Sequence, residues 1–144
     1  MVDREAIFPG LQGAAHQITS LATGEYNCIA SAVGDVGRWW WPDPLGKRYW
    51  PAGVIRAETV SAFQEAFESL GFVNCADEHL EPDFEKIALF ADDKGPQHAA
   101  RQLPSGRWTS KLGELEDIEH APDDLEGVEY GKIVTVMRRQ IPTP

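Results

Sequence analysis

The feature that most constrains the fold is the turn signal Pro104-Ser105-Gly106, which separates two strand-like segments at residues 98–103 and 107–112. Proline and glycine beside a serine favour a tight reversal of the chain, and two strands joined so closely pair antiparallel. We therefore expect a β-hairpin in which Arg101 opposes Ser110. The register is open by one residue, and a slip of one residue would move each side chain to the other face.

The hydrophobic period changes along the chain. Residues 58–70 carry apolar side chains at helical spacing, and Asn27 is a suitable N-cap for a shorter helix over about residues 28–36. Residues 86–91 and 131–139 instead have the composition of strands. Helices followed by antiparallel strands predict the α+β class, with N-terminal helices packed on a C-terminal antiparallel β-sheet.

Length and composition limit the class of protein. The 144 residues fit a single domain over residues 1–144. A formal net charge of -10 argues against nucleic acid or an anionic membrane as a partner. The sequence has no apolar run of the roughly 18 residues that a membrane span needs, and its N-terminus does not read as a secretory signal. We therefore expect a cytoplasmic protein with reduced thiols.

The two cysteines have different settings and no metal-type spacing. Cys28 opens the helix expected over residues 28–36, where partial positive charge and free N–H groups favour a thiolate and can hold an oxyanion. Cys75 follows a helix stop and is expected to be structural. The alternative for Cys28 is a small buried hydrophobe, a common state of free cysteine. We expect no metal and no cofactor.

A thiol nucleophile needs a base, and His98 has the most suitable setting among the four histidines. It follows the Gly95-Pro96 turn and begins a strand that can anchor it. His16 lies in a polar loop, while His79 and His120 lie among acidic residues. The alternative for His98 is an ordinary hydrogen-bonded histidine in a strand.

The base in turn needs a third group that fixes its tautomer and orientation. Hairpin geometry brings the second strand close to His98, so Ser110, Thr109 and Glu114 are candidates for this hydrogen bond. Ser110 is the preferred residue. Because the register is open, a shift of one or two residues would bring Glu114 to the same place.

A second conspicuous feature is the aromatic loop, residues 39–50, which holds Trp39, Trp40, Trp41, Tyr49 and Trp50. Its prolines exclude a long helix or a central strand. Three consecutive tryptophans cannot all face one way, so at least one is expected to be exposed or to line a groove. If the loop roofs a binding groove, at least one of the three rings should be more exposed than Trp108. The alternative, which we favour for most of the five rings, is that they hold the loop against the core.

The order of these residues resembles the papain-like cysteine peptidase and amidase superfamily. The resemblance is carried by Cys28 at the head of a helix, by His-Ala-Ala at 98–100, by Trp-Thr-Ser-Lys-Leu-Gly at 108–113 and by the segment 129–136. It implies a papain-like fold with Cys28 as nucleophile and His98 as base. Ser110 then stands where the superfamily has asparagine.

The glutamine that papain-type enzymes place before the cysteine, as an oxyanion donor, is missing. By the resemblance, Asn27, Thr23 or Tyr26 would take this role. Trp40 of the aromatic loop is expected to contact substrate. More narrowly, Tyr-Asn-Cys-Ile-Ala at 26–30 and the tryptophan loop resemble a family of uncharacterised, mostly bacterial proteins, which brings no known activity.

Two functions from different classes follow. The preferred one is a thiol-dependent hydrolase or acyltransferase that acts on a peptide or another amide-containing substrate. In that case the helix N-terminus and His98 lower the pKa of Cys28. The alternative is a catalytically inactive papain-like binding module that holds a protein partner on the aromatic loop.

Overall fold

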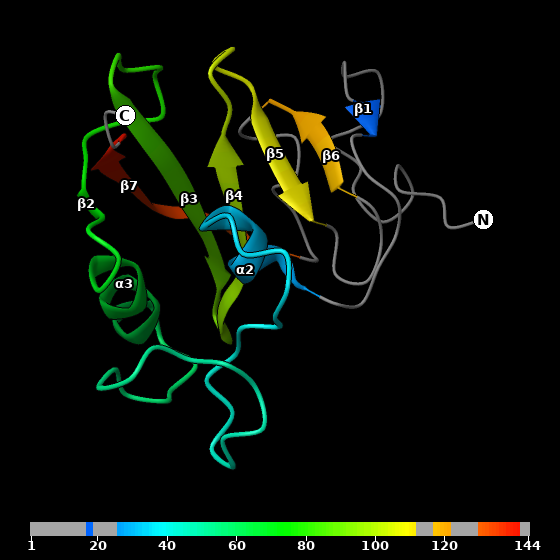
Figure 1. The fold of residues 1–144 in the computed structure, drawn as a ribbon, viewed down its shortest axis with the longest axis vertical. Coiled ribbons are helices and arrows are strands. Elements are labelled where there is room, and N and C mark those ends of the chain that lie inside the picture. Colours follow the sequence, from blue (N-terminus) through cyan, green and yellow to red (C-terminus); the bar gives the residue numbers. More distant parts are fainter. Residues whose placement is uncertain (1–16, 19–25, 112–116, 122–129, 142–144) are drawn as a thin grey trace.

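The structure is a computed structural model and describes residues 17–18, 26–111, 117–121 and 130–141. In this part of the chain, seven strands form one sheet in the order β1-β6-β5-β4-β3-β7-β2 (Figure 1). Every neighbouring pair is antiparallel. The strands are β1 (Gln17–Ile18), β2 (Val73–Asn74), β3 (Phe84–Asp92), β4 (Gly95–Gln102), β5 (Trp108–Lys111), β6 (Asp117–His120) and β7 (Lys132–Gln140).

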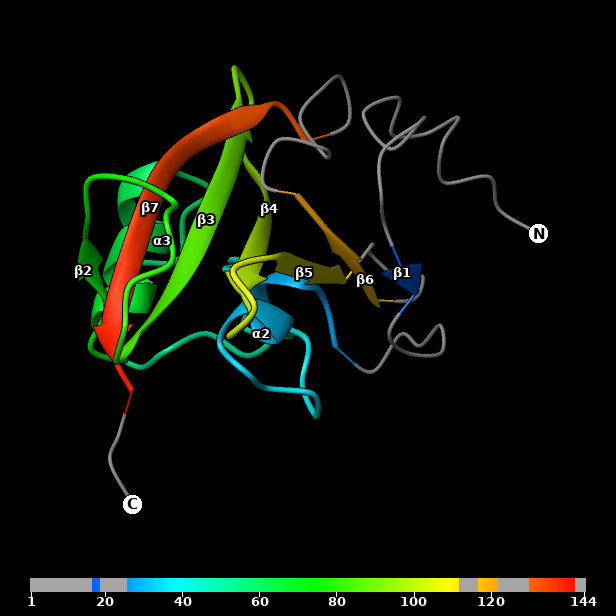
Figure 2. The ribbon, with the colours of Figure 1, turned by 90° about the horizontal axis from the view of Figure 1, so that it is seen from above.

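Two helices are described, α2 (Cys28–Ala32) and α3 (Val60–Glu68). Seen from above, α2 lies beside β4 and β5 (Figure 2). Phe63 of α3 packs in the same core as Leu89 of β3 and Met137 of β7. The amphipathic pattern over residues 58–70 correctly predicted α3, whose capping residue Thr59 accepts a hydrogen bond from the Ala62 N–H. Neither described helix is long and apolar enough to cross a lipid bilayer.

The expected papain-like layout, with N-terminal helices packed on a C-terminal sheet, is wrong. The described chain is mostly antiparallel sheet with two short helices, and strand β1 precedes both of them. One physical reason is visible at α2, which was expected to reach residue 36 but ends at Ala32. Gly34 takes a φ of 85°, a left-handed conformation that ends a helix and suits glycine.

The β4–β5 hairpin is confirmed, but its register differs by one residue from the expected one. Arg101 pairs with Thr109, and Gln102 pairs with Trp108. The turn is one residue shorter than the expected register requires, because the Leu103 N–H donates to the Arg107 carbonyl at 2.7 Å and leaves only Pro104, Ser105 and Gly106 in the loop. By strand alternation, Ser110 therefore lies on the same face as Gln102 rather than that of Arg101.

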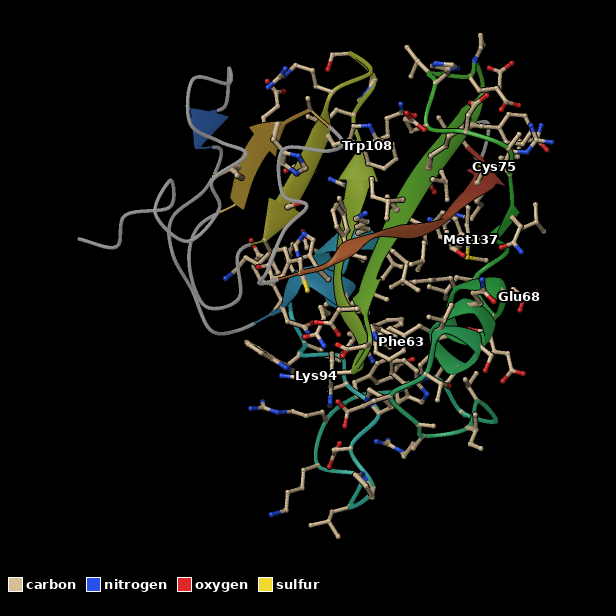
Figure 3. The ribbon with its side chains drawn as sticks, turned by 180° about the vertical axis from the view of Figure 1, so that it is seen from behind. Phe63, Glu68, Cys75, Lys94, Trp108 and Met137 are labelled. Carbon is tan, nitrogen blue, oxygen red and sulfur yellow. The ribbon has the colours of Figure 1, made fainter. Side chains whose placement is uncertain are left out.

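The sheet separates two apolar cores. The larger lies on the helix side and includes Phe63 of α3, Ala99 of β4 and Met137 of β7 (Figure 3). The smaller core lies on the other side of β3 and β4 and contains Ala88, Phe90, Ala100, Trp108 and Ile118. Consecutive strand residues alternate between the two cores, so the face of each candidate residue can be read from its neighbours.

Candidate functional site

Cys28 lies at the start of α2, against strand β4. The backbone N–H groups of Ala99, Ile29 and Cys28 itself lie near the sulfur and favour its thiolate, as does the charge of Lys111. Cys28 is nevertheless 8% exposed, and burial, the largest effect, raises the pKa of its thiol to about 11. The expected lowering of this pKa is wrong, because desolvation of a thiolate outweighs the N-terminus of a five-residue helix.

His98 lies on the other side of β4. Its ring stacks on Tyr130 with centroids 4.0 Å apart and meets the ring of Phe90 edge-on. Neither ring nitrogen has a hydrogen-bond partner within the described part of the chain. Burial, with a smaller contribution from His120, holds the pKa of His98 well below its ordinary value, so the ring is neutral.

Cys28 and His98 are therefore brought to the same strand but not to the same face. The residue after His98, Ala99, packs with Cys28 in the helix-side core, whereas His98 packs beside Phe90 of the smaller core. Among the described residues, no hydrogen bond joins the thiol to this imidazole. Within the described segments, the arrangement leaves a protonated thiol without a base.

Ser110 binds a different histidine. Its Oγ lies 2.6 Å from Nε2 of His120, and Nδ1 of His120 lies 2.7 Å from the Ala121 carbonyl. Since a carbonyl only accepts, Nδ1 carries a proton and donates it to the Ala121 carbonyl. Ser110 is 1% and His120 0% exposed, so the pair is closed to solvent and joins β5 to β6.

The sequence reading missed His120, which was assigned to an acidic loop. The available signal was the alternation of Ile118 and His120, which lie on one face of β6 and are both buried. Of the other candidates for the third residue, Thr109 pairs with Arg101, and Glu114 lies outside the described residues. No cluster of metal-ligating side chains occurs in the part of the chain that the structure describes.

The residues expected to bind an oxyanion or substrate hold the aromatic loop instead. Oδ1 of Asn27 accepts from the backbone N–H groups of Ala30 and Trp40, and its Nδ2 donates to the Trp40 carbonyl at 2.6 Å. Trp40 is 2% exposed and donates its indole N–H to Asp35. Tyr26 is buried, with the Lys111 ammonium 5.4 Å from its ring centre. Thr23 lies outside the described residues.

The aromatic loop is partly a core element and partly a surface. Trp40 and Trp50 are buried, and the rings of Trp41 and Trp50 both meet Phe63 edge-on. Trp39 and Trp41 remain half-buried, whereas Trp108 is fully buried. Both expectations are confirmed, since most rings pack against the core and at least one of the three consecutive tryptophans is more exposed than Trp108.

Basic side chains cover the outer part of this loop. The guanidinium of Arg38 lies 3.7 Å from the ring centre of Tyr49, and that of Arg48 lies 5.2 Å from the ring centre of Trp39. Residues 36–56 contain four basic side chains and one acidic one, Asp43, in a chain whose net charge is -10. Arg38 also pairs with Asp35, which directly precedes this segment, at 2.9 Å. The segment still carries more basic than acidic side chains and forms a positive surface on an acidic protein, mainly through Lys47 and Arg48.

Asp43 fixes the shape of the loop tip. Its carboxylate accepts from the backbone N–H groups of Lys47 and Arg48, and it pairs with Arg56. These backbone hydrogen bonds hold the pKa of Asp43 below its ordinary value. The single acidic group of the segment is thus used inside the loop, while the arginines that stack on Tyr49 and Trp39 face solvent.

Comparison with known proteins gives one match. No curated protein and no solved structure matches the chain significantly. A family model described as a domain of unknown function, DUF7689, matches residues 17–138. That range includes both described helices, the aromatic loop and strands β1 to β6 in full. The chain therefore belongs to the DUF7689 family.

Proposed function

We propose that this chain is a binding module that holds an acidic segment of a protein or peptide on its aromatic loop. The observation that carries the proposal is the pair of exposed arginines stacked on half-buried rings, Arg38 on Tyr49 and Arg48 on Trp39. Arginine, tryptophan and tyrosine are the residues most enriched at the energetic centres of protein interfaces.

The rigidity of the loop supports this function. The Asn27 side chain binds both the backbone N–H and the backbone carbonyl of Trp40, and the Trp40 backbone forms a β-bridge with Tyr49. Asp43 orders the tip through the hydrogen bonds described above. A loop that is already ordered loses less conformational entropy on binding, so more of the contact energy appears as affinity.

The charge of the segment favours an acidic partner. A guanidinium that lies flat on an aromatic ring keeps its N–H groups directed outward, parallel to the ring. Two of these N–H groups can donate side by side to one carboxylate. The chain as a whole is acidic, so an anionic partner is attracted at this surface and repelled elsewhere. This contrast in charge orients an acidic partner toward the aromatic loop and selects it over a basic partner.

A defined polymer tests the proposal. We would titrate the protein with a fluorescent random copolymer of glutamate and tyrosine, and with a lysine–tyrosine copolymer as the charge-reversed control. Arg48→Gln should raise the Kd for the acidic copolymer about fivefold, as loss of an interface arginine does. Arg107→Gln makes the same chemical change on the β4–β5 turn, at the far end of the sheet, and should leave Kd unchanged (Figure 1).

Two results would contradict the binding function. One is equal affinity for the acidic and basic copolymers, and the other is an equal effect of the Arg48 and Arg107 substitutions. A thermal melt of each variant separates loss of binding from loss of fold.

The second candidate function is a thiol-dependent hydrolase or acyltransferase with Cys28 as nucleophile. Its specific support is the set of backbone N–H groups around the Cys28 sulfur, with Lys111 nearby, which would stabilise a thiolate or an oxyanion. The high pKa of the buried thiol and the position of His98 on the other face count against it. Selective labelling of Cys28 near neutral pH would favour this second function over the first.

We also propose that the protein is located in the cytoplasm. Both cysteines are unpaired, and they lie in separate parts of the fold. Reducing compartments keep thiols in this state.

A further inference from the structure

A cavity of about 670 Å³ lies at the opposite end of the sheet from the aromatic loop. Its walls come from residues 80–85, from the end of β4 with the following turn, and from Ile141 after β7. These segments meet at the top of Figure 1, whereas the aromatic loop lies at the bottom. The volume falls within the range of small-molecule sites, roughly 300–1,000 Å³.

The walls are largely apolar. Leu80 and Ile141 are among the most exposed large hydrophobic residues of the described chain, at 51% and 44%. The other apolar lining residues are Pro82, Phe84, Leu103 and Pro104. Exposed apolar side chains that converge on one cavity, rather than lying scattered, are typical of a binding site.

Gln102, one of the lining residues, has a buried acceptor without a partner. Nε2 of Gln102 donates to the Glu78 carbonyl at 2.8 Å and approaches the Gly106 carbonyl at 3.5 Å. Because carbonyls only accept, these bonds fix which end of the amide is nitrogen. Oε1 is therefore fixed as well, and it is buried with no hydrogen-bond partner in the described part of the chain. A ligand N–H group would satisfy it.

The charged side chains around the cavity differ in whether they already have an ion-pair partner. Glu81 pairs with Arg138 and Lys86, and Glu85 pairs with Arg139. In the described chain, the carboxylate of Asp83 makes no such pair. Among the lining carboxylates of the described chain, Asp83 is therefore the one that no cation pairs with.

The position of Asp83 is fixed by its backbone. Its φ is 68°, and its carbonyl accepts from the Ile141 N–H at 2.8 Å. Arg101, the lining cation, has its Nη1 beside Gly34 on the helix side of the sheet. The polar groups that the cavity offers are thus an acceptor and an anion, with the guanidinium directed away.

We propose that this cavity binds a small molecule that joins an apolar body to a protonated amine. The apolar body packs between Leu80, Phe84 and Ile141, and the ammonium group donates to Gln102 Oε1 and lies within the field of Asp83. A carboxylic acid of the same shape is repelled, and a neutral alcohol supplies only part of the interaction. The site is distinct from the aromatic loop and does not depend on its function.

Three probes of nearly equal shape test this assignment: 2-phenylethylamine, 2-phenylethanol and 3-phenylpropanoate. Each is titrated into the full chain and followed by amide chemical shifts in NMR. The amine should bind with a Kd about tenfold below that of the alcohol, and the acid should not bind at concentrations of about 10 mM. The shifted amides should be those of residues 80–85 and 101–104.

Asp83→Asn is the main variant, because asparagine tolerates a positive φ and keeps the shape of the side chain. It should raise the Kd of the amine about tenfold and leave that of the alcohol unchanged. Asp93→Asn removes the same charge from the exposed β3–β4 turn and should change neither. Leu80→Ala should weaken the amine and the alcohol equally.

Several results would overturn the proposal: binding of the acid as tight as that of the amine, no shift with the amine at about 10 mM, or equal effects of the Asp83 and Asp93 substitutions. Shifts that map to the aromatic loop instead of this cavity would overturn it as well.

Discussion

Replacing His98 with phenylalanine should stabilise the protein in mild acid. The His98 ring is fully buried between Tyr130 and Phe90, and its two nitrogens have no partner in the described chain. Phenylalanine keeps the ring stacking and removes both unsatisfied nitrogens. A buried polar group without a partner costs about 1–3 kcal/mol, and the slightly larger ring offsets part of this gain. At neutral pH we expect a net gain of about 1 kcal/mol.

The pH dependence is the sharper part of this prediction. Burial lowers the pKa of His98 in the folded state, so below about pH 6.5 the unfolded chain binds a proton that the folded chain does not. This stability is present above the unfolded pKa and is lost as the pH falls, by about 1.4 kcal/mol per unit. Between about pH 6.5 and pH 5 the parent loses about 2 kcal/mol through His98, and the variant does not.

Urea unfolding at a series of pH values measures both effects. The free energy of unfolding of His98→Phe minus that of the parent should rise by about 2 kcal/mol on acidification across this window. Taking this difference cancels the contribution of the other histidines to the pH dependence. The control is His79→Gln, at a side chain that is 84% exposed, which should show no such rise. A constant difference between His98→Phe and parent would refute a buried neutral imidazole. If His98→Phe lowers the free energy of unfolding by more than about 2 kcal/mol at neutral pH, the unsatisfied nitrogens of His98 do not destabilise the parent as argued.

Two further predictions concern the thiols and a glycine. Since burial raises the pKa of Cys28 to about 11 while Cys75 is only half-buried, iodoacetamide should modify Cys75 first at pH 8, as read by peptide mass spectrometry; faster labelling of Cys28 would contradict its buried state. Gly131→Ala should destabilise by more than about 3 kcal/mol in thermal or urea unfolding, because a Cβ there would lie 2.1 Å from the Ala91 carbonyl oxygen. Gly53→Ala, with a similar φ but open space, should cost only about 1 kcal/mol.

The elements with strong local signals could be predicted from the sequence. The apolar stripe over residues 58–70 gave α3, and the apolar run at 86–91 gave the centre of β3. The turn at Pro104-Ser105-Gly106 gave the β4–β5 hairpin. Each of these depends on residues that are close in sequence, so no knowledge of tertiary packing was needed.

The candidate site depends on packing, and that is where the sequence reading failed. The register is fixed in the turn between Gln102 and Trp108 by a backbone hydrogen bond from Leu103 to Arg107. A backbone hydrogen bond of this kind cannot be predicted from residue types. His120 was overlooked because its acidic neighbours suggested a loop, although it pairs opposite Trp108 inside the sheet. The pKa of Cys28 was set by burial, a property of the whole fold rather than of the helix that begins there.

One oxygen atom couples the head of α2 to the aromatic loop. Oδ1 of Asn27 accepts from Ala30 in the helix and from Trp40 in the loop, so a movement of this side chain removes both contacts at once. The helix and the loop therefore open as a single cooperative unit rather than as two independent segments. A molecule that restrains the loop is therefore expected to restrain the helix that bears Cys28 as well.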